Sequence, residues 1–147
     1  MSKTIIVSSD HAGFILKKKI LEFKYDNELS FIDLGPFSED SVDYPDFAHN
    51  LSKDINCGKY SSGILICGSG IGMSIVANRY ENVRAALCLN HEMARLSRQH
   101  NDANVLVLGS RLISEKEAIK SILAFMSTEF EGGRHQTRLQ KLNDVKN

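Results

Sequence analysis

A short apolar segment followed by closely spaced glycines constrains the fold of this chain more than any other feature. Residues 63–67 (Gly-Ile-Leu-Ile-Cys) are apolar and partly β-branched, which is typical of a buried strand. Gly68, Gly70 and Gly72 follow, and residues 73–77 then open a helix. Strand, glycine loop and helix form an anion-binding arrangement, because the backbone can approach a ligand closely and the first helical amides carry partial positive charge.

Cys67 stands at the mouth of this loop, where helix-end amides would stabilise a thiolate. The loop lacks the Gly-Lys-Ser/Thr of a nucleotide-binding P-loop. It also fits the dinucleotide fingerprint poorly, since Met73 stands where a glycine is needed and residues 88–90 lack the ribose-binding acid. On residue type alone, the commoner interpretation of Cys67 is a small buried side chain in a strand-to-helix turn.

Short apolar segments alternate with amphipathic ones along the chain, which indicates one α/β domain over residues 1–147. Strands are expected at 4–9, 30–34, 63–67, 83–89 and 104–108. The pattern predicts a three-layer αβα, Rossmann-like fold with a five-stranded parallel sheet and an additional C-terminal helix. We expect the strand order 2-1-3-4-5. Asp10 and His11 at the end of strand one would then meet Cys67 at the end of strand three, where such sheets bind ligands.

Helix signals support this alternation. The helix after the first strand has an apolar face formed by Leu16, Ile20 and Phe23, with lysines 17–19 mostly on the opposite, solvent-facing side. Further helices are expected to start near Pro45, at Asn90 as a cap, and at Ser114-x-x-Glu117 as a capping box.

Composition excludes several classes of function. The 18 basic and 18 acidic residues cancel, so the chain has no general basic field for nucleic acid. Cys57, Cys67 and Cys88 form no C-x-x-C motif and have no histidines at metal-ligand spacing, which favours a reducing cytoplasm and predicts no metal. No apolar segment approaches the ~18 residues of a membrane span, and the first apolar run is too short for a signal sequence.

A set of spaced motifs identifies a resemblance that covers nearly the whole chain. The motifs are Ser9–Gly13, Asp43–Pro45, Cys67–Gly72, Ser97–Asp102, Gly109–Arg111 and Glu131–Arg138. In this order they resemble the ribose-5-phosphate isomerase B family, whose scaffold is shared by galactose-6-phosphate isomerase subunits. The resemblance implies a cofactor-free, cytoplasmic aldose–ketose isomerase that interconverts ribose 5-phosphate and ribulose 5-phosphate.

The resemblance also implies a role for individual residues. Cys67 would be the base that moves a proton from C2 to C1 through an enediolate, and His100 would open the sugar ring. Ser69, where many members have threonine, would shuttle a proton between the sugar oxygens. Residues expected to bind the substrate, with the arginines gripping its phosphate, are Asp10, His11, Tyr44, Gly68, Gly70, Ile71, Gly72, Asn101, Arg111, Arg134 and Arg138.

The family builds its site between two subunits, so a homodimer or higher homo-oligomer is expected, and His100 or some arginines would come from the partner. Two alternatives stay open. One is an isomerase for a six-carbon sugar phosphate, such as galactose 6-phosphate or allose 6-phosphate. The other is a non-catalytic sugar-phosphate- or nucleotide-binding module in which Cys67 is inert.

Overall fold

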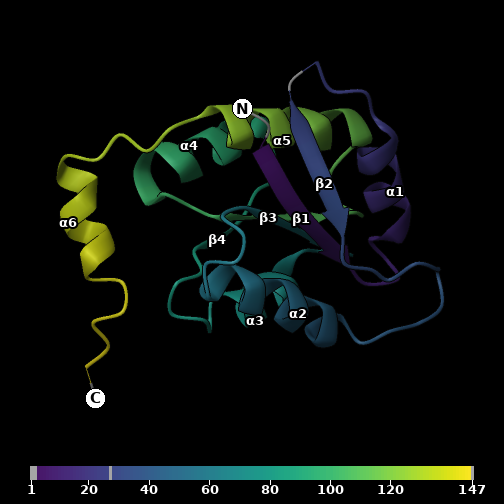
Figure 1. Cartoon of the computed structure of the whole chain (residues 1–147), viewed down its shortest axis with the longest axis horizontal. Coiled ribbons are helices and arrows are strands. Elements are labelled where there is room, and N and C mark those ends of the chain that lie inside the picture. Colours follow the sequence, from purple (N-terminus) through teal and green to yellow (C-terminus); the bar gives the residue numbers. More distant parts are fainter. Residues whose placement is uncertain (1–2, 27, 147) are drawn as a thin grey trace.

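A parallel β-sheet lies between two layers of helices in the computed structural model, which describes residues 3–26 and 28–146 (Figure 1). The strands are β1 (Lys3–Ser9), β2 (Leu29–Asp33), β3 (Gly63–Cys67), β4 (Ala85–Leu87) and β5 (Val105–Gly109). Each pairing between these strands is parallel. The predicted three-layer α/β architecture with a five-stranded sheet is therefore confirmed.

The strand order is β2-β1-β3-β5-β4, so the predicted order 2-1-3-4-5 is wrong for the last two strands. All five residues of β5 are buried, and this strand pairs with β3 through Cys67 opposite Gly109. The three residues of β4 are only half-buried, as suits an edge strand. Because β1 and β3 remain neighbours, the exchange leaves the predicted ligand site where the sequence placed it.

Two apolar cores hold the layers together. The helices are α1 (Phe14–Glu22), α2 (Tyr44–Asn56), α3 (Ile71–Ala77), α4 (His91–Asn101), α5 (Glu115–Ser127) and α6 (Arg134–Gln140). Helices α1, α4 and α5 pack on one face of the sheet, whereas α2 and α3 cover the other (Figure 1). The predicted C-terminal helix, α6, stands away from the sheet beyond α4. In the described part of the chain, no helix combines the length and apolarity needed to cross a bilayer.

The starts of α4 and α5 are capped as predicted, and they are also joined to each other. The side chain of Asn90 accepts a hydrogen bond from the Met93 amide (2.9 Å), and Ser114 Oγ accepts one from the Glu117 amide (3.1 Å). The Glu117 carboxylate does not return to its own helix cap but accepts hydrogen bonds from the His91 amide (2.7 Å) and ring (2.6 Å). These contacts, the amide first, lower the pKa of Glu117.

Lys17 is buried, contrary to the prediction that it faces solvent. Its side chain is 1% exposed, and Nζ lies 2.6 Å from Asp33 Oδ1 and 2.6 Å from the carbonyl oxygen of Pro36. Asp33 at the end of β2 and Pro36 in the segment after it supply these oxygens, which replace water around the ammonium group. Lys17 therefore ties α1 to the segment that follows β2. Phe23, predicted on the buried face, is instead 44% exposed at the C-terminus of α1.

The outer edge of β4 is covered by a side chain. Asn78 follows α3 and aligns its amide with the backbone of Ala85: Nδ2 donates to the Ala85 carbonyl (3.0 Å), and the Ala85 amide donates to Oδ1 (2.8 Å). The side chain thus makes the pair of hydrogen bonds that a neighbouring strand would make.

Candidate active site

A cleft of about 590 Å³ lies at the carboxyl ends of β1 and β3, where the sheet reverses its strand order. Most residues predicted for the site line this cleft. They are Asp10, His11, Tyr44, Cys67, Gly68, Ser69, Ile71, Gly72 and Arg111. Residues from segments more than one hundred positions apart therefore meet at one edge of the sheet.

Cys67 lies at the last position of β3 and is held from two sides. Its carbonyl accepts a hydrogen bond from the Ser110 amide (2.8 Å), and its Sγ accepts one from the Gly70 amide (3.1 Å). Gly70 points its N–H at the sulfur from a left-handed backbone (φ +79°), and an added Cβ there would lie 2.5 Å from Leu87 Cδ1. An amide hydrogen directed at sulfur stabilises negative charge on it. Cys67 is 6% exposed and opens onto the cleft.

Tyr44 forms one wall of the cleft because Gly72 leaves room for it. A Cβ on Gly72 would lie 2.3 Å from Cε1 of the Tyr44 ring, so a glycine is needed for this packing. The ring is 39% exposed and contributes its remaining surface to the cleft. Ser69 lines the same cleft, and its Oγ accepts a hydrogen bond from the Ile71 amide (3.2 Å).

The end of β1 contributes a buried carboxylate and a partly exposed imidazole. Asp10 is 7% exposed, and its Oδ1 accepts a hydrogen bond from the Gly13 amide (3.0 Å). His11 Nδ1 lies 3.1 Å from the Val42 amide nitrogen and 3.2 Å from the Val42 carbonyl oxygen. The backbone of residue 42 therefore holds the ring, and Nε2 is left for a ligand.

Arg111 supplies a cation to the same cleft. Its amide donates a hydrogen bond to the Gly68 carbonyl (3.0 Å), and its guanidinium passes so close to Gly68 that an added Cβ there would lie 2.9 Å from Nη1. The side chain is exposed. A guanidinium over an amide-rich loop is suited to a phosphate, which accepts hydrogen bonds from both.

The other predicted residues lie outside this cleft. His100 and Asn101 end α4, and Arg134 and Arg138 project from α6 with exposed side chains. We refer to residues 131–140 as the C-terminal arm; in Figure 1, its helix α6 lies beyond α4, and none of the arm's residues lines the cleft. One chain therefore presents two separate groups of predicted residues, and the roles predicted for the second group remain predictions.

His135 is a residue of the second group that the sequence analysis missed. It is 7% exposed, and its ring stacks on that of His100 with centroids 4.5 Å apart and planes 15° apart. His135 Nε2 also lies 3.5 Å from Glu131 Oε2. Glu131 precedes α6, so helical spacing does not predict this contact, and the only signal in the sequence was that both residues belong to one motif.

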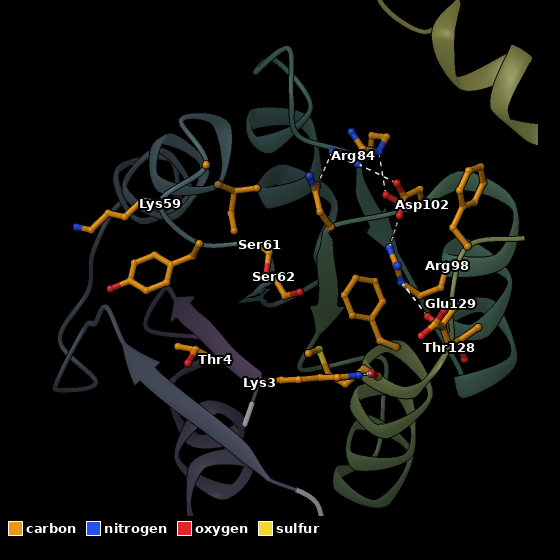
Figure 2. A pocket seen from close by; sticks show the side chains of 17 residues that line it. Lys3, Thr4, Lys59, Ser61, Ser62, Arg84, Arg98, Asp102, Thr128 and Glu129 are labelled. Carbon is orange, nitrogen blue, oxygen red and sulfur yellow. Dashed lines mark hydrogen bonds and ion pairs between the residues drawn. The ribbon is translucent and has the colours of Figure 1, made fainter. Parts of the chain in front are cut away.

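A larger hollow, of about 1060 Å³, lies at the opposite, amino-terminal edge of the sheet (Figure 2). Its basic residues are already bound within the chain. Lys3 Nζ donates to the Met126 carbonyl (2.6 Å), while Arg84 and Arg98 both contact the carboxylate of Asp102, at 3.5 and 2.8 Å. Since these cations have internal partners, the cleft at the carboxyl ends is the better candidate for an anionic ligand.

This chain is similar to known proteins over nearly its full length. A model of the family described as Ribose/Galactose Isomerase matches residues 5–142. Ribose-5-phosphate isomerase B of Escherichia coli (strain K12) is 40% identical over 143 residues, which cover 97% of this chain and 96% of that protein.

Solved structures are similar over nearly the full length. A ribose 5-phosphate isomerase from Thermotoga maritima is 47% identical with a TM-score of 0.94, over 99% of this chain and 100% of that one. Ribose-5-phosphate isomerase B from Mycoplasma genitalium, solved with bound ribulose-5-phosphate, is 42% identical with a TM-score of 0.89, over 97% and 95% of the two chains.

Proposed function

Because this chain belongs to the ribose/galactose isomerase family, we propose that it interconverts ribose 5-phosphate and ribulose 5-phosphate. The observation that carries the proposal is the position of Cys67: a thiol at the switch point of the sheet, opening onto a cleft and receiving the Gly70 amide at 3.1 Å. The Mycoplasma genitalium relative, which binds ribulose-5-phosphate, supports a pentose phosphate as the ligand.

The proposed chemistry transfers one proton between adjacent carbons. Cys67, as the thiolate, removes the proton from C2 of the open-chain aldose, and the electron pair of that bond forms the enediolate. The resulting thiol returns the proton to C1, while Ser69 Oγ relays a proton between the two sugar oxygens. The amides of residues 68–72 lie beside Cys67, where they can stabilise charge on the enediolate oxygen.

This reaction requires neither an electron acceptor nor a carrier of chemical groups, so the proposal includes no cofactor. Free Cys57, Cys67 and Cys88 fit a reducing compartment, and we place the enzyme in the cytoplasm. Activity should persist in a chelator such as EDTA.

Ring opening and phosphate binding are assigned to residues of both groups. His100 would move a proton to the ring oxygen of the cyclic sugar, and Asn101 would bind a sugar hydroxyl. Arg111 and His11 would bind the phosphate together with Arg134 and Arg138. Because His100 and the arm lie outside the cleft of their own chain, we propose a homodimer in which each arm completes the site of the partner.

The primary test is turnover of ribose 5-phosphate by the purified protein in EDTA, beside galactose 6-phosphate and allose 6-phosphate. Turnover of the pentose alone supports the proposal. Turnover of a hexose phosphate alone keeps the mechanism but changes the substrate. If none is turned over, a non-catalytic sugar-phosphate-binding module becomes the better account.

Subunit complementation tests the shared site. Cys67→Ala and His100→Ala proteins, each nearly inactive, are mixed after reversible dissociation. If sites are shared, each heterodimer carries one intact and one doubly altered site, and random mixing restores about a quarter of wild-type activity. If each chain holds a complete site, no activity returns. Each variant subjected alone to the same dissociation serves as the control.

A further inference from the structure

Three potential metal ligands meet where the arm contacts α4. The ligand atoms of His100, Glu131 and His135 all lie within 4.8 Å of one another. The two imidazoles are stacked, and the Glu131 carboxylate lies 3.5 Å from Nε2 of His135. None of these contacts is used by the proton transfer at Cys67.

The backbone holds this group in place. The Glu131 amide donates a hydrogen bond to the Gln99 carbonyl (3.1 Å), one residue before His100. The His135 amide donates to the Gly132 carbonyl (3.1 Å) in the turn that joins Glu131 to α6. His135 is 7% exposed, so its ring has a fixed environment. The donors are therefore brought together by the fold and not only by mobile side chains.

We propose that His100, Glu131 and His135 form a site for a zinc ion, and that zinc bound there inhibits the enzyme. Two imidazole nitrogens and one carboxylate oxygen are a common set of three protein ligands for Zn²⁺, with a fourth position left for water. Imidazole donors favour Zn²⁺ and neighbouring transition metals over Mg²⁺ or Ca²⁺.

Coordination requires the three donors to move closer together and one of the two stacked rings to rotate. Ligand atoms about 2.05 Å from a tetrahedral zinc ion are ~3.3 Å apart. The 3.5 Å between Glu131 Oε2 and His135 Nε2 is close to this value, whereas the limit of 4.8 Å for the whole set requires contraction. The half-exposed Glu131 side chain and the partly exposed His100 ring can supply this contraction. The His100 ring has to rotate out of the stack, because a zinc ion lies in the plane of each imidazole that binds it, while His135 keeps its buried position.

The charges around the three ligands determine how tightly zinc binds. Glu131 supplies one negative charge, and Arg95 is close enough to interact electrostatically with it. That guanidinium is bound mainly by Glu92 and also contacts Gln99. Arg134 is adjacent in sequence to His135 and adds a second positive charge nearby. We therefore expect a reversible, inhibitory site that binds zinc more weakly than a structural zinc centre does.

Inhibition, unlike zinc binding, rests on the proposed function. Zinc on His100 occupies the nitrogen lone pair that ring opening requires. Ribulose 5-phosphate cannot form a furanose ring, because its C5 oxygen carries the phosphate, so it enters as an open chain. Zinc should therefore slow the initial rate more from ribose 5-phosphate than from ribulose 5-phosphate.

The binding test titrates metal-free protein with Zn²⁺ in competition with a chromogenic chelator, and repeats the titration with Co²⁺ while recording its visible absorption. We expect one zinc per chain and tetrahedral cobalt bands. Glu131→Gln and His135→Ala should each weaken binding at least tenfold. His91→Gln is the matched control, because His91 lies on the same helix as His100 and also contacts a glutamate, Glu117 of α5, but is not part of the three-ligand cluster.

Two results would overturn the site: no zinc binding by the wild-type protein, or binding that is unchanged in both cluster variants. In the second case, loss of binding in Cys67→Ala with a sulfur-to-cobalt charge-transfer band would move the metal to the thiol. Zinc binding without turnover of any sugar phosphate would keep the site and reject the proposed function. Turnover of a sugar phosphate without zinc binding would keep the proposed function and reject the zinc site.

Discussion

The cleft around Cys67 and the C-terminal arm both carry residues predicted to act on the same substrate, yet the fold holds them in opposite ways. In the cleft, Cys67 and Asp10 are nearly buried, and backbone amides bind the sulfur and the carboxylate. In the arm, His135 is buried, whereas Arg134 and Arg138 are exposed.

This difference indicates which part of the predicted site needs a fixed geometry before the substrate binds. Proton transfer at carbon needs its base within a few tenths of an ångström of the productive position, which a sheet edge with packed glycines provides. A phosphate can be bound by long, flexible side chains that adopt their final conformation when the phosphate binds. If the proposed roles are correct, the arm needs only to lie near a cleft when the substrate binds, whereas the geometry of the cleft has to be set by the fold.

The largest effect is expected from removing the sulfur in the cleft. Cys67→Ala should lower kcat by about 10³-fold, because a positioned base is lost, while the thermal unfolding temperature stays close to that of the wild type. Isomerisation assays and thermal unfolding measure both quantities. Near-normal turnover would exclude Cys67 as the base.

Cys88→Ala is the matched control, because Cys88 is 1% exposed and burial raises the pKa of its thiol to about 11. We expect it to keep kcat and lose about 1 kcal/mol of stability. Iodoacetamide followed by peptide mass spectrometry should modify Cys67 faster than Cys88, and ribose 5-phosphate should protect Cys67.

The arm should show the opposite kinetic behaviour. Arg138→Ala is expected to raise KM for ribose 5-phosphate by about tenfold to a hundredfold with a smaller change in kcat, because a charge-assisted phosphate contact is lost. Its unfolding temperature should not change, since the side chain is exposed. Lys141→Ala, which removes an exposed cation at the end of α6, is the control. A loss confined to kcat would argue against a role in phosphate binding.

A third change tests the buried contacts by which Lys17 ties α1 to the segment that follows β2. Lys17→Met should reduce the free energy of unfolding by about 2 kcal/mol, because Asp33 loses its buried partner while remaining partly accessible to water. Lys18→Met, at the exposed neighbouring position, should have almost no effect. Urea denaturation of the two variants makes the comparison, and equal stabilities would show that the Lys17 contacts do not stabilise the fold.

The smallest effect is expected at the start of α4, where His91 contacts Glu117. The folded state lowers the pKa of Glu117 below its ordinary value of 4.5, so its contacts with His91 stabilise the protein above that pH and are lost as the pH falls through the lowered pKa. The wild-type unfolding temperature should therefore exceed that of Glu117→Gln at pH 7, and the difference should shrink toward pH 3.

Glu115→Gln, in the same helical turn, controls for the general effect of removing a carboxylate. A difference between the wild type and Glu117→Gln that stays constant down to pH 3 would show that ionisation of Glu117 does not contribute. Scanning calorimetry between the two pH values is suitable for both variants.

Local patterns were sufficient to predict the five strands, most helix starts and the meeting of Asp10 and His11 with Cys67, whereas Tyr44, Ser69 and Arg111 were assigned to the site from the family resemblance. Asn90 and Ser114 cap their helices as expected, because a cap depends on residues only three positions away. Patterns of this kind do not report which of two apolar segments is central, so β4 and β5 were exchanged. Burial of Lys17 was also missed, because its partners Asp33 and Pro36 are distant in sequence.

The two groups of site residues differ in how far the sequence could predict their positions. Motif residues at strand ends converge through sheet topology alone, as Asp10 and Cys67 do. The contact of His100 with His135 depends on how the chain between α5 and α6 returns to α4, which no local periodicity encodes.

The side chain of Asn78 has a consequence for how copies of this chain meet. A growing sheet recruits further strands through free backbone groups on its outermost strand, and short edge strands with blocked groups resist such stacking. By occupying both the amide and the carbonyl of Ala85, Asn78 removes that attachment point from β4. A strand from another copy therefore cannot pair with the backbone of Ala85 unless Asn78 first moves away.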